Sequence, residues 1–226
     1  MKLPAPDDKA RAVRTMFDSI AGRYDLVNRV MTFGLDQRWR RWAVRQMRLA
    51  PGSVVLDLAC GTGDFCRELE RAGYRAVGVD FAHEMLRAAS TRAPLVQADI
   101  LRLPMRDASV DAITCGFALR NVSSIPALFA EAARVVRPGG RAVLLEVSAP
   151  RNTLARAVHG FYFNRVVPVI GGVLSSKEAY QYLPASVSYL PEPRALAQML
   201  LDAGFKTTAR ATLSGGAVQV LAGTRR

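Results

Sequence analysis

The sequence predicts an α/β fold: a single, doubly wound and mostly parallel sheet of seven strands with helices on both faces. Two observations support this prediction. Short apolar runs alternate with helix-like runs between residues 51 and 150, as in βαβ units, where a helix joins two parallel strands. A glycine-rich loop, Gly61-Thr62-Gly63, also connects the first apolar run to a helix, and such loops are typical of nucleotide-binding sheets.

Helices are expected before the sheet. Apolar residues such as Val13 and Phe17 recur at helical spacing over residues 9–20. A second helix is expected over 24–47, with a break near Phe33-Gly34. The Pro51-Gly52 turn then separates these helices from the first strand.

The elements of the sheet follow from apolar runs bounded by glycine and proline. In chain order we expect strand 54–56, helix 65–72, strand 76–79, helix 83–90, strand 94–98, strand 110–116, helix 125–136 and strand 142–147. An aromatic, helical segment over 151–190 interrupts this alternation. A helix over 192–203 then precedes a terminal pair of strands, 206–212 and 217–223.

Composition limits the class of partner. Lys and Arg number 31 against 19 Asp and Glu, which gives a net charge of +12. This charge favours a polyanionic partner, either nucleic acid or anionic lipid, but it is also compatible with no specific partner of that kind. No run of about 18 apolar residues occurs, so no membrane-spanning helix is expected. The three cysteines have no ligand spacing, so we expect reduced thiols, no metal site and a cytoplasmic location.

The acids beside the glycine-rich loop indicate which nucleotide it binds. A dinucleotide fingerprint has a third glycine where this chain has Cys66. Asp57 and Asp64 also bracket the loop, and their charges would repel a pyrophosphate. S-adenosylmethionine suits these acids better, because it carries a sulfonium and an ammonium group.

Two further acids follow the next two strands. Asp80 is placed to accept the ribose hydroxyls, and Asp99 the adenine amino group. With Asp57, they occupy the carboxyl ends of three successive strands, at one edge of the sheet. The alternative is that each caps the helix or turn that follows it.

Three stretches carry a more specific resemblance: Phe17-Asp18-Ser19-Ile20-Ala21-Gly22-Arg23-Tyr24-Asp25, Leu119-Arg120-Asn121-Val122 and Tyr182-Leu183-Pro184. With them, the chain from about residue 13 onward resembles the demethylmenaquinone and ubiquinone-precursor C-methyltransferases. The resemblance implies a Rossmann-like class I fold and S-adenosylmethionine as the methyl donor. It implies methylation of a prenylated quinol, either demethylmenaquinol to menaquinol or a benzoquinol precursor of ubiquinone.

The resemblance also assigns cofactor-binding residues, and the loop adds its own. Thr62, Asp80, Asp99 and Ile100 are implied as contacts, while Gly116 replaces a serine that is usual in the family. The full expected set of cofactor-binding residues is Tyr24, Asp57, Gly61, Thr62, Gly63, Asp80, Asp99, Ile100 and Gly116. A single domain, 1–226, would then comprise a helical lid (1–50), a cofactor-binding core (51–150), a substrate-covering insertion (151–190) and a last helix with the terminal strands (191–226).

Candidate catalytic residues are Arg120, Asn121 and His159. Arg120 is suited to stabilise a phenolate, since arginine stays protonated, but a salt bridge to a neighbouring acid is an equal alternative. His159 is a candidate base, with simple packing as its alternative. Tyr24 either contacts the cofactor through its hydroxyl or packs in the N-terminal helices.

Aromatic residues are expected to form the wall of the quinol site. The candidates are Phe117, Phe161, Tyr162, Tyr180 and Tyr182. The alternatives for the 151–190 segment are a cap on the sheet and a homodimer face.

A basic helix suggests that the protein contacts the inner face of an anionic membrane. Two tryptophans, Trp39 and Trp42, lie among five arginines at positions 38, 40, 41, 45 and 48, and Arg with Trp suits a headgroup region. The alternative is that the tryptophans are buried and the arginines only solvated.

Two other functions compete with quinol methylation. An RNA methyltransferase would fit the positive charge, but the residues after the fourth strand, Phe117-Ala118-Leu119-Arg120, lack a base-flipping signature. We therefore expect no nucleic-acid partner. A non-catalytic quinone-binding subunit is disfavoured, since the loop, Asp80 and Asp99 are all present.

Overall fold

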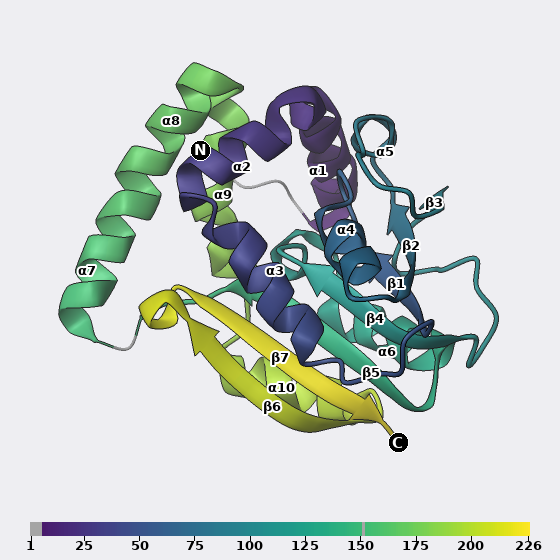
Figure 1. The fold of residues 1–226 in the computed structure, drawn as a ribbon. Helices are drawn as coiled ribbons and strands as arrows, with labels where there is room; N and C mark the ends of the chain where they lie inside the picture. Colours follow the sequence, from purple (N-terminus) through teal and green to yellow (C-terminus); the bar gives the residue numbers. More distant parts are fainter. Residues whose placement is uncertain (1–5, 151) are drawn as a thin grey trace.

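The computed structural model describes residues 6–150 and 152–226 and is built on a seven-stranded sheet of order β3-β2-β1-β4-β5-β7-β6 (Figure 1). The strands are β1 (Val54–Leu58), β2 (Arg75–Asp80), β3 (Leu95–Gln97), β4 (Val110–Gly116), β5 (Val136–Val147), β6 (Phe205–Leu213) and β7 (Val218–Arg225). The pairs among β1 to β5 are parallel, and β7 runs antiparallel to both of its neighbours. The predicted fold class is confirmed.

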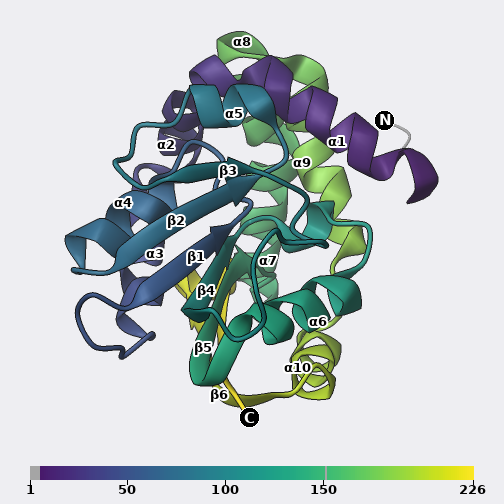
Figure 2. The ribbon, with the colours of Figure 1, turned by 90° about the vertical axis from the view of Figure 1, so that its right-hand side faces the viewer.

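Helices cover both faces of the sheet. They are α1 (Pro6–Ile20), α2 (Tyr24–Thr32), α3 (Leu35–Arg45), α4 (Asp64–Arg71), α5 (His83–Arg87), α6 (Ile125–Val135), α7 (Thr153–Phe161), α8 (Val167–Leu174), α9 (Lys177–Ser186) and α10 (Pro193–Asp202). Figure 2 shows α6 and α10 on one face, with α3 and α4 on the other. Leu128 and Leu200 belong to the core of the first face, while Val44 and Leu69 belong to that of the second.

A third apolar cluster lies above the carboxyl ends of the parallel strands. It joins α1, α2 and α5 to α8 and α9 through residues such as Ile20, Val27, Met85 and Tyr180. In Figure 1, α7 and α8 run on as one long helical rod beside α2. A π-helical turn, Tyr162–Val166, joins them. The helices of both the N-terminal and the 151–190 segments therefore gather at the edge of the sheet where ligands of open α/β folds bind.

The break expected near Phe33-Gly34 is confirmed. Phe33 and Gly34 have φ values of 52° and 70°, in the left-handed region that ends helices. One expected boundary was wrong: β5 begins at Val136, because Val136 already pairs with Val110. The Pro138-Gly139-Gly140 run lies at an irregularity of this strand and does not precede it.

Candidate functional site

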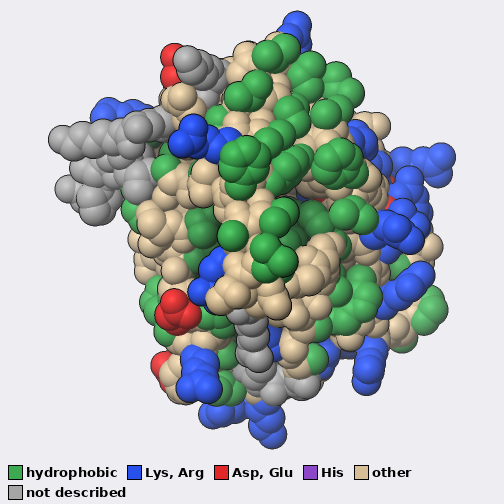
Figure 3. Space-filling model, turned by 90° about the vertical axis from the view of Figure 1, so that its left-hand side faces the viewer, with side chains coloured by type: hydrophobic (Ala, Val, Ile, Leu, Met, Phe, Trp, Pro, Cys, Tyr) green, Lys and Arg blue, Asp and Glu red, His purple; other side chains and the backbone are tan. Residues whose placement is uncertain are grey.

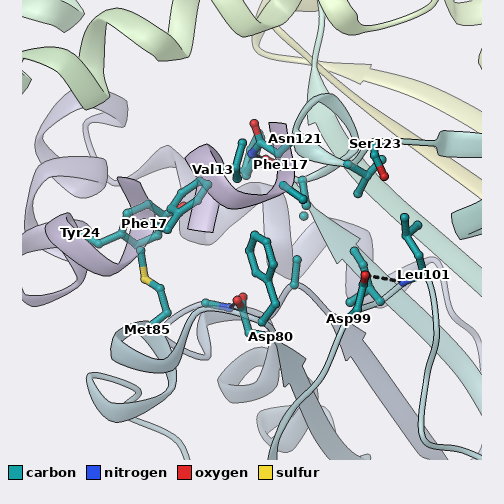
Figure 4. A pocket seen from close by; sticks show the side chains of 18 residues that line it. Val13, Phe17, Tyr24, Asp80, Met85, Asp99, Leu101, Phe117, Asn121 and Ser123 are labelled. Atoms are coloured by element: carbon teal, nitrogen blue, oxygen red, sulfur yellow. Dashed lines mark hydrogen bonds between the residues drawn. The ribbon is translucent and has the colours of Figure 1, made fainter. Parts of the chain in front are cut away.

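A cavity opens at the carboxyl ends of the paired strands β1 and β4, at the point where the strand order reverses. Its volume is about 770 Å³ when the open mouth is included. Its walls include Phe17 and Tyr24 from the N-terminal helices, and Asp80 and Asp99 from the strand ends (Figure 4). We call this space the nucleoside cavity.

Asp80 is held at the edge of the nucleoside cavity by backbone donors. It is the last residue of β2, and its carboxylate accepts the amide of Gly61 at 2.8 Å and that of Ala82 at 2.9 Å. Burial nevertheless raises the pKa of Asp80, with those amide bonds opposing the effect. Asp80 therefore caps the turn before α5 and also lines the cavity, and its role as a cofactor ligand stays a prediction.

The glycine-rich loop reaches the nucleoside cavity through its backbone. Gly61 lines the cavity with a φ of 53°, a conformation that glycine adopts readily. Gly116 lines it as well, and a Cβ there would lie 2.6 Å from the ring of Phe65. The position therefore has no room for a serine side chain while Phe65 stays in place.

Asp99 and Ile100 also line the nucleoside cavity, and in Figure 4 Asp99 lies on the side away from Tyr24. The Asp99 carboxylate accepts the amide of Leu101 at 2.9 Å (Figure 4). Ile100 is buried beside it and lines the cavity too. The apolar side chains of Ile100 and Leu101 can pack against a flat base, and the carboxylate of Asp99 beside them can accept a hydrogen bond from an amino group of that base.

Three predicted cofactor residues, Asp57, Thr62 and Gly63, do not line the nucleoside cavity. Asp57 lies beneath the loop and accepts the Thr114 hydroxyl at 2.8 Å, and burial raises its pKa to about 7. The Thr62 hydroxyl donates to the carboxylate of Asp25. Gly63 has a φ of 84° and begins α4, with Thr91 against its Cα.

A second cavity adjoins the first, and its volume is about 1100 Å³ when its open mouth is included. Both are lined by Phe17, Tyr24 and Phe117, which therefore stand at the boundary between them. The second cavity is mainly apolar and aromatic, and its wall extends from α2 and α3 to the π-helical turn. We call it the ring cavity.

The charged or titratable residues that line the ring cavity include the ion pair of Asp36 and Arg40, and also Arg120 and His159. The His159 ring stacks on Phe163 at a centroid distance of 5.7 Å and an interplanar angle of 10°. Burial lowers the pKa of His159, so the imidazole is neutral near pH 7 and able to accept a proton.

Arg120 is 5% exposed and is paired with Glu146, which is 1% exposed. The salt bridge left open as an alternative is therefore present, and Arg120 lines the ring cavity as well. Glu146 also accepts the amide of Val147 at 2.9 Å. In the described part of the chain, Arg120 Nε, Glu146 Oε2 and the Oδ1 of neighbouring Asn121 have no hydrogen-bond partner. This pair fixes a positive charge at the cavity wall.

Glu146 is the site residue that the sequence reasoning did not assign. It stands in the apolar run Val143 to Val147 of β5. A single acid inside such a strand requires a buried, positively charged partner. An acid within an apolar run was therefore the sequence signal from which this ion pair could have been predicted.

The aromatic residues predicted for the quinol wall divide into two groups. Phe117 and Tyr162 line the ring cavity, and the Tyr162 hydroxyl donates to the carbonyl of Met31 at 2.7 Å. Phe161 is 66% exposed, while Tyr180 and Tyr182 are buried in packing, and none of these three lines either cavity. The ring of Tyr180 packs on Gly171, and a substrate contact of these three residues stays a prediction.

The basic helix α3 makes several contacts within the protein. Trp39 donates to Ser214 Oγ at 2.9 Å, and both tryptophans pack against the core, only partly exposed. Arg40 is buried in ion pairs with Asp36 at 2.8 Å and Asp64 at 3.4 Å. The tryptophans are therefore partly buried, whereas Arg38, Arg41 and Arg45 are exposed, and contact of this helix with a membrane stays a prediction.

The nucleoside cavity fits S-adenosylmethionine in its chemistry. Asp80 and Asp99 offer acceptors for hydroxyl and amino groups, and Asn121, whose buried Oδ1 has no partner in the described residues, offers another. Among residues 6–150 and 152–226, no cluster that could hold a metal ion is found, and no helix could span a membrane.

A model of the ubiE/COQ5 methyltransferase family matches residues 5–225. A relative from Deinococcus radiodurans, named demethylmenaquinone methyltransferase, is 47% identical over 92% of this chain and 90% of its own. A second, from Geotalea uraniireducens, is named ubiquinone/menaquinone biosynthesis C-methyltransferase and is 40% identical over 96% of this chain and 97% of its own.

Solved structures share the fold at low sequence identity. A magnesium protoporphyrin IX methyltransferase from Synechocystis with bound S-adenosylmethionine matches with a TM-score of 0.66 and 17% identity over the whole of both chains. A methyltransferase in complex with the Trm112 activator from Haloferax volcanii also has a TM-score of 0.66, at 18% identity over 92% of this chain and 96% of that one.

Proposed function

The chain belongs to the ubiE/COQ5 methyltransferase family, and we propose that it methylates a ring carbon of demethylmenaquinol with S-adenosylmethionine, giving menaquinol. The observation that carries this proposal is the junction of the two cavities at Phe17, Tyr24 and Phe117. An acid-lined cavity suited to a nucleoside adjoins an aromatic cavity suited to a flat ring, so the two reactants can meet at this boundary.

The two strand-end acids and the loop bind the cofactor in this proposal. Asp80 accepts ribose hydroxyls, and Asp99 accepts the adenine amino group. When bound, S-adenosylmethionine supplies a methyl group on a positively charged sulfur. Tyr24 and Phe117 line both cavities and would position the quinol ring beside the bound cofactor, which is the positioning part of the catalysis.

Arg120 and His159 activate the ring in the proposed mechanism. A quinol carbon becomes nucleophilic when the hydroxyl group shares or loses its proton. Neutral His159 accepts that proton, and the charge of Arg120, held in place by Glu146, stabilises the phenolate oxygen. The methyl group would pass from the sulfur of bound S-adenosylmethionine to the ring carbon as the sulfur–carbon bond breaks, which would leave S-adenosylhomocysteine. The hydrogen of that ring carbon would be released as a proton, and His159 would return its proton to the quinol oxygen.

The helices that surround the cavities exclude water from them in this proposal. Residues 1–50 would act as a lid over the nucleoside cavity, and residues 151–190 as a cover over the ring cavity. Both segments contribute wall residues, such as Phe17 and Tyr162. We also propose that the enzyme works at a membrane surface, since a prenylated quinol resides in lipid, and we keep a homodimer as a second arrangement to be tested.

A benzoquinol precursor of ubiquinone is the second candidate substrate, because some relatives carry both quinones in their names. The test uses purified protein, labelled S-adenosylmethionine and short-tailed demethylmenaquinol or the matching benzoquinol. Label in the naphthoquinol product supports the proposal. Label only in the benzoquinol product would replace the substrate, and label in neither would refute quinol methylation.

A further inference from the structure

The exposed large hydrophobic side chains of this protein are not scattered. Among the described residues, every one of them lies on α2, on its last turn, or on the α7–α8 rod: Leu26, Val30, Phe33, Leu154, Val158, Phe161, Val169 and Val173. Their exposed fractions range from 41% for Val30 to 78% for Phe33. Single exposed apolar residues need no explanation, but a contiguous set on adjacent helices marks an interaction surface.

The α7–α8 rod presents these residues along one side. Leu154, Val158 and Phe161 are spaced by four and three residues, as on one face of an α-helix. The π-helical turn inserts an extra residue per turn, and this returns Val169 and Val173 toward the same side. The opposite side of the rod packs inward, where Val167 and Tyr162 belong to the apolar cluster with α2.

Figure 3 views the molecule from this side. Hydrophobic side chains form a band across the face, with Lys and Arg around it and few acids. The segment Thr153–Leu174 contains Arg156 and Arg165, both exposed, and no Asp or Glu. The acid of α2, Asp25, is paired with Arg29 and Arg67. The face is therefore apolar in the middle and positive at its margins.

The band is continuous with the opening of the ring cavity. Phe33 lines that cavity and is also the most exposed side chain of the band. Its ring lies 6.1 Å from that of Tyr162, centroid to centroid, so the two rings border the opening. A ligand with a long apolar tail can leave the ring cavity here without its tail entering water.

We propose that this face, the outer side of α2 and the α7–α8 rod, docks on an anionic lipid bilayer, with the opening at Phe33 and Tyr162 turned toward the acyl chains. An apolar face with basic margins matches the acyl and headgroup layers of such a surface. Arg165 lies within the apolar side and reaches the headgroups through its long side chain. This inference rests on the proposed function for its choice of a lipid partner, and it relocates the contact from α3 to the α7–α8 rod.

The experiment is flotation with vesicles of phosphatidylcholine alone or mixed with phosphatidylglycerol, at low salt. Val169 and Val173 line neither the nucleoside cavity nor the ring cavity, so V169D/V173D adds two charges to the face without touching the site. The matched control is A12D/T15D, which adds the same charge at exposed positions of α1. Figure 2 shows that α1, which carries the control substitutions, lies in front of α8, which carries Val169 and Val173.

We expect the wild type and A12D/T15D to float with the mixed vesicles, and V169D/V173D to lose about tenfold or more of that binding. Absence of wild-type binding, or equal binding of the two variants, overturns the proposal. If V169D/V173D instead turns a dimer into a monomer in light scattering, while no form binds vesicles, the face is an interface between copies of the chain.

Methyl transfer separates this inference from the proposed function. With a short-tailed quinol free in solution, V169D/V173D should keep wild-type turnover, and with a long-tailed quinol in mixed vesicles it should lose activity along with binding. If the wild type floats but methylates no quinol, the docking surface stands and the proposed function fails. If V169D/V173D loses activity on the short-tailed quinol too, the face belongs to the catalytic site, and the docking proposal is overturned.

Discussion

Glu146→Gln should separate the positioning of Arg120 from the fold that surrounds it. Arg120 is 5% exposed and Glu146 is 1% exposed, so the change leaves a buried guanidinium without its counter-charge. Removing one partner of a buried pair costs about 3–5 kcal/mol. The glutamine oxygen can still accept a hydrogen bond from the charged group, worth about 1.5–3 kcal/mol. We therefore expect a loss of about 2 kcal/mol in the free energy of unfolding.

The effect of Glu146→Gln on the reaction should exceed its effect on the fold. Without its anchor, Arg120 no longer holds its charge against the phenolate oxygen, and loss of one such electrostatic contact lowers kcat by about 100-fold. The KM for S-adenosylmethionine should stay unchanged, because neither Arg120 nor Glu146 lines the nucleoside cavity.

The assay combines urea unfolding with steady-state kinetics on the short-tailed quinol. The control is Glu131→Gln, since Glu131 pairs with Arg134 on α6, away from both cavities. A folded Glu146→Gln protein with turnover within about threefold of the wild type, against the expected 100-fold loss, would refute a positioning role. A parallel rise in the KM for the cofactor would point to general distortion.

Three further predictions concern the acids and the base. Asp80→Asn should weaken S-adenosylmethionine binding about tenfold in calorimetry, because a charged acceptor is lost, and unchanged affinity would exclude Asp80 as a ligand. Asp57 has a pKa raised from 3.8 to about 7, so the folded state binds the extra proton and stability should fall as pH rises from about 4 to about 7. This difference in pKa corresponds to at most about 4 kcal/mol of unfolding free energy. Asp57→Asn should make the unfolding free energy nearly independent of pH between about 4 and 7. A pH dependence equal to that of the wild type would contradict the raised pKa. His159→Gln should lower kcat by about 100-fold and remove the acidic limb of its pH profile, a limb that must persist if His159 only packs.

The sequence predicted the sheet well, because its apolar runs are short and bounded by glycine and proline. It placed Asp80 and Asp57 alike, although they lie at different positions in their strands. Asp80 is the last residue of β2 and reaches the edge, whereas β1 continues to Leu58, so Asp57 projects from the face of the sheet toward Thr114. A difference of one residue in the end of a strand decides which acid meets the cavity.

The aromatic segment was harder to predict in detail. Its composition indicated a wall for a flat ring, and Tyr162 takes that place. The orientation of the others depends on a π-helical turn and on the contact of Tyr180 with Gly171, neither of which has a periodic signal. Glu146 was unassigned for a related reason, since its partner Arg120 is 26 residues away in the chain.

The most direct test of the central claim is a single-turnover reaction of the wild-type protein with labelled S-adenosylmethionine and short-tailed demethylmenaquinol, with the label located in the product. The account predicts label on a carbon of the quinol ring, and a large loss of rate in Arg120→Gln with cofactor binding retained. Label on a quinol oxygen, or no labelled quinol at all, would contradict it.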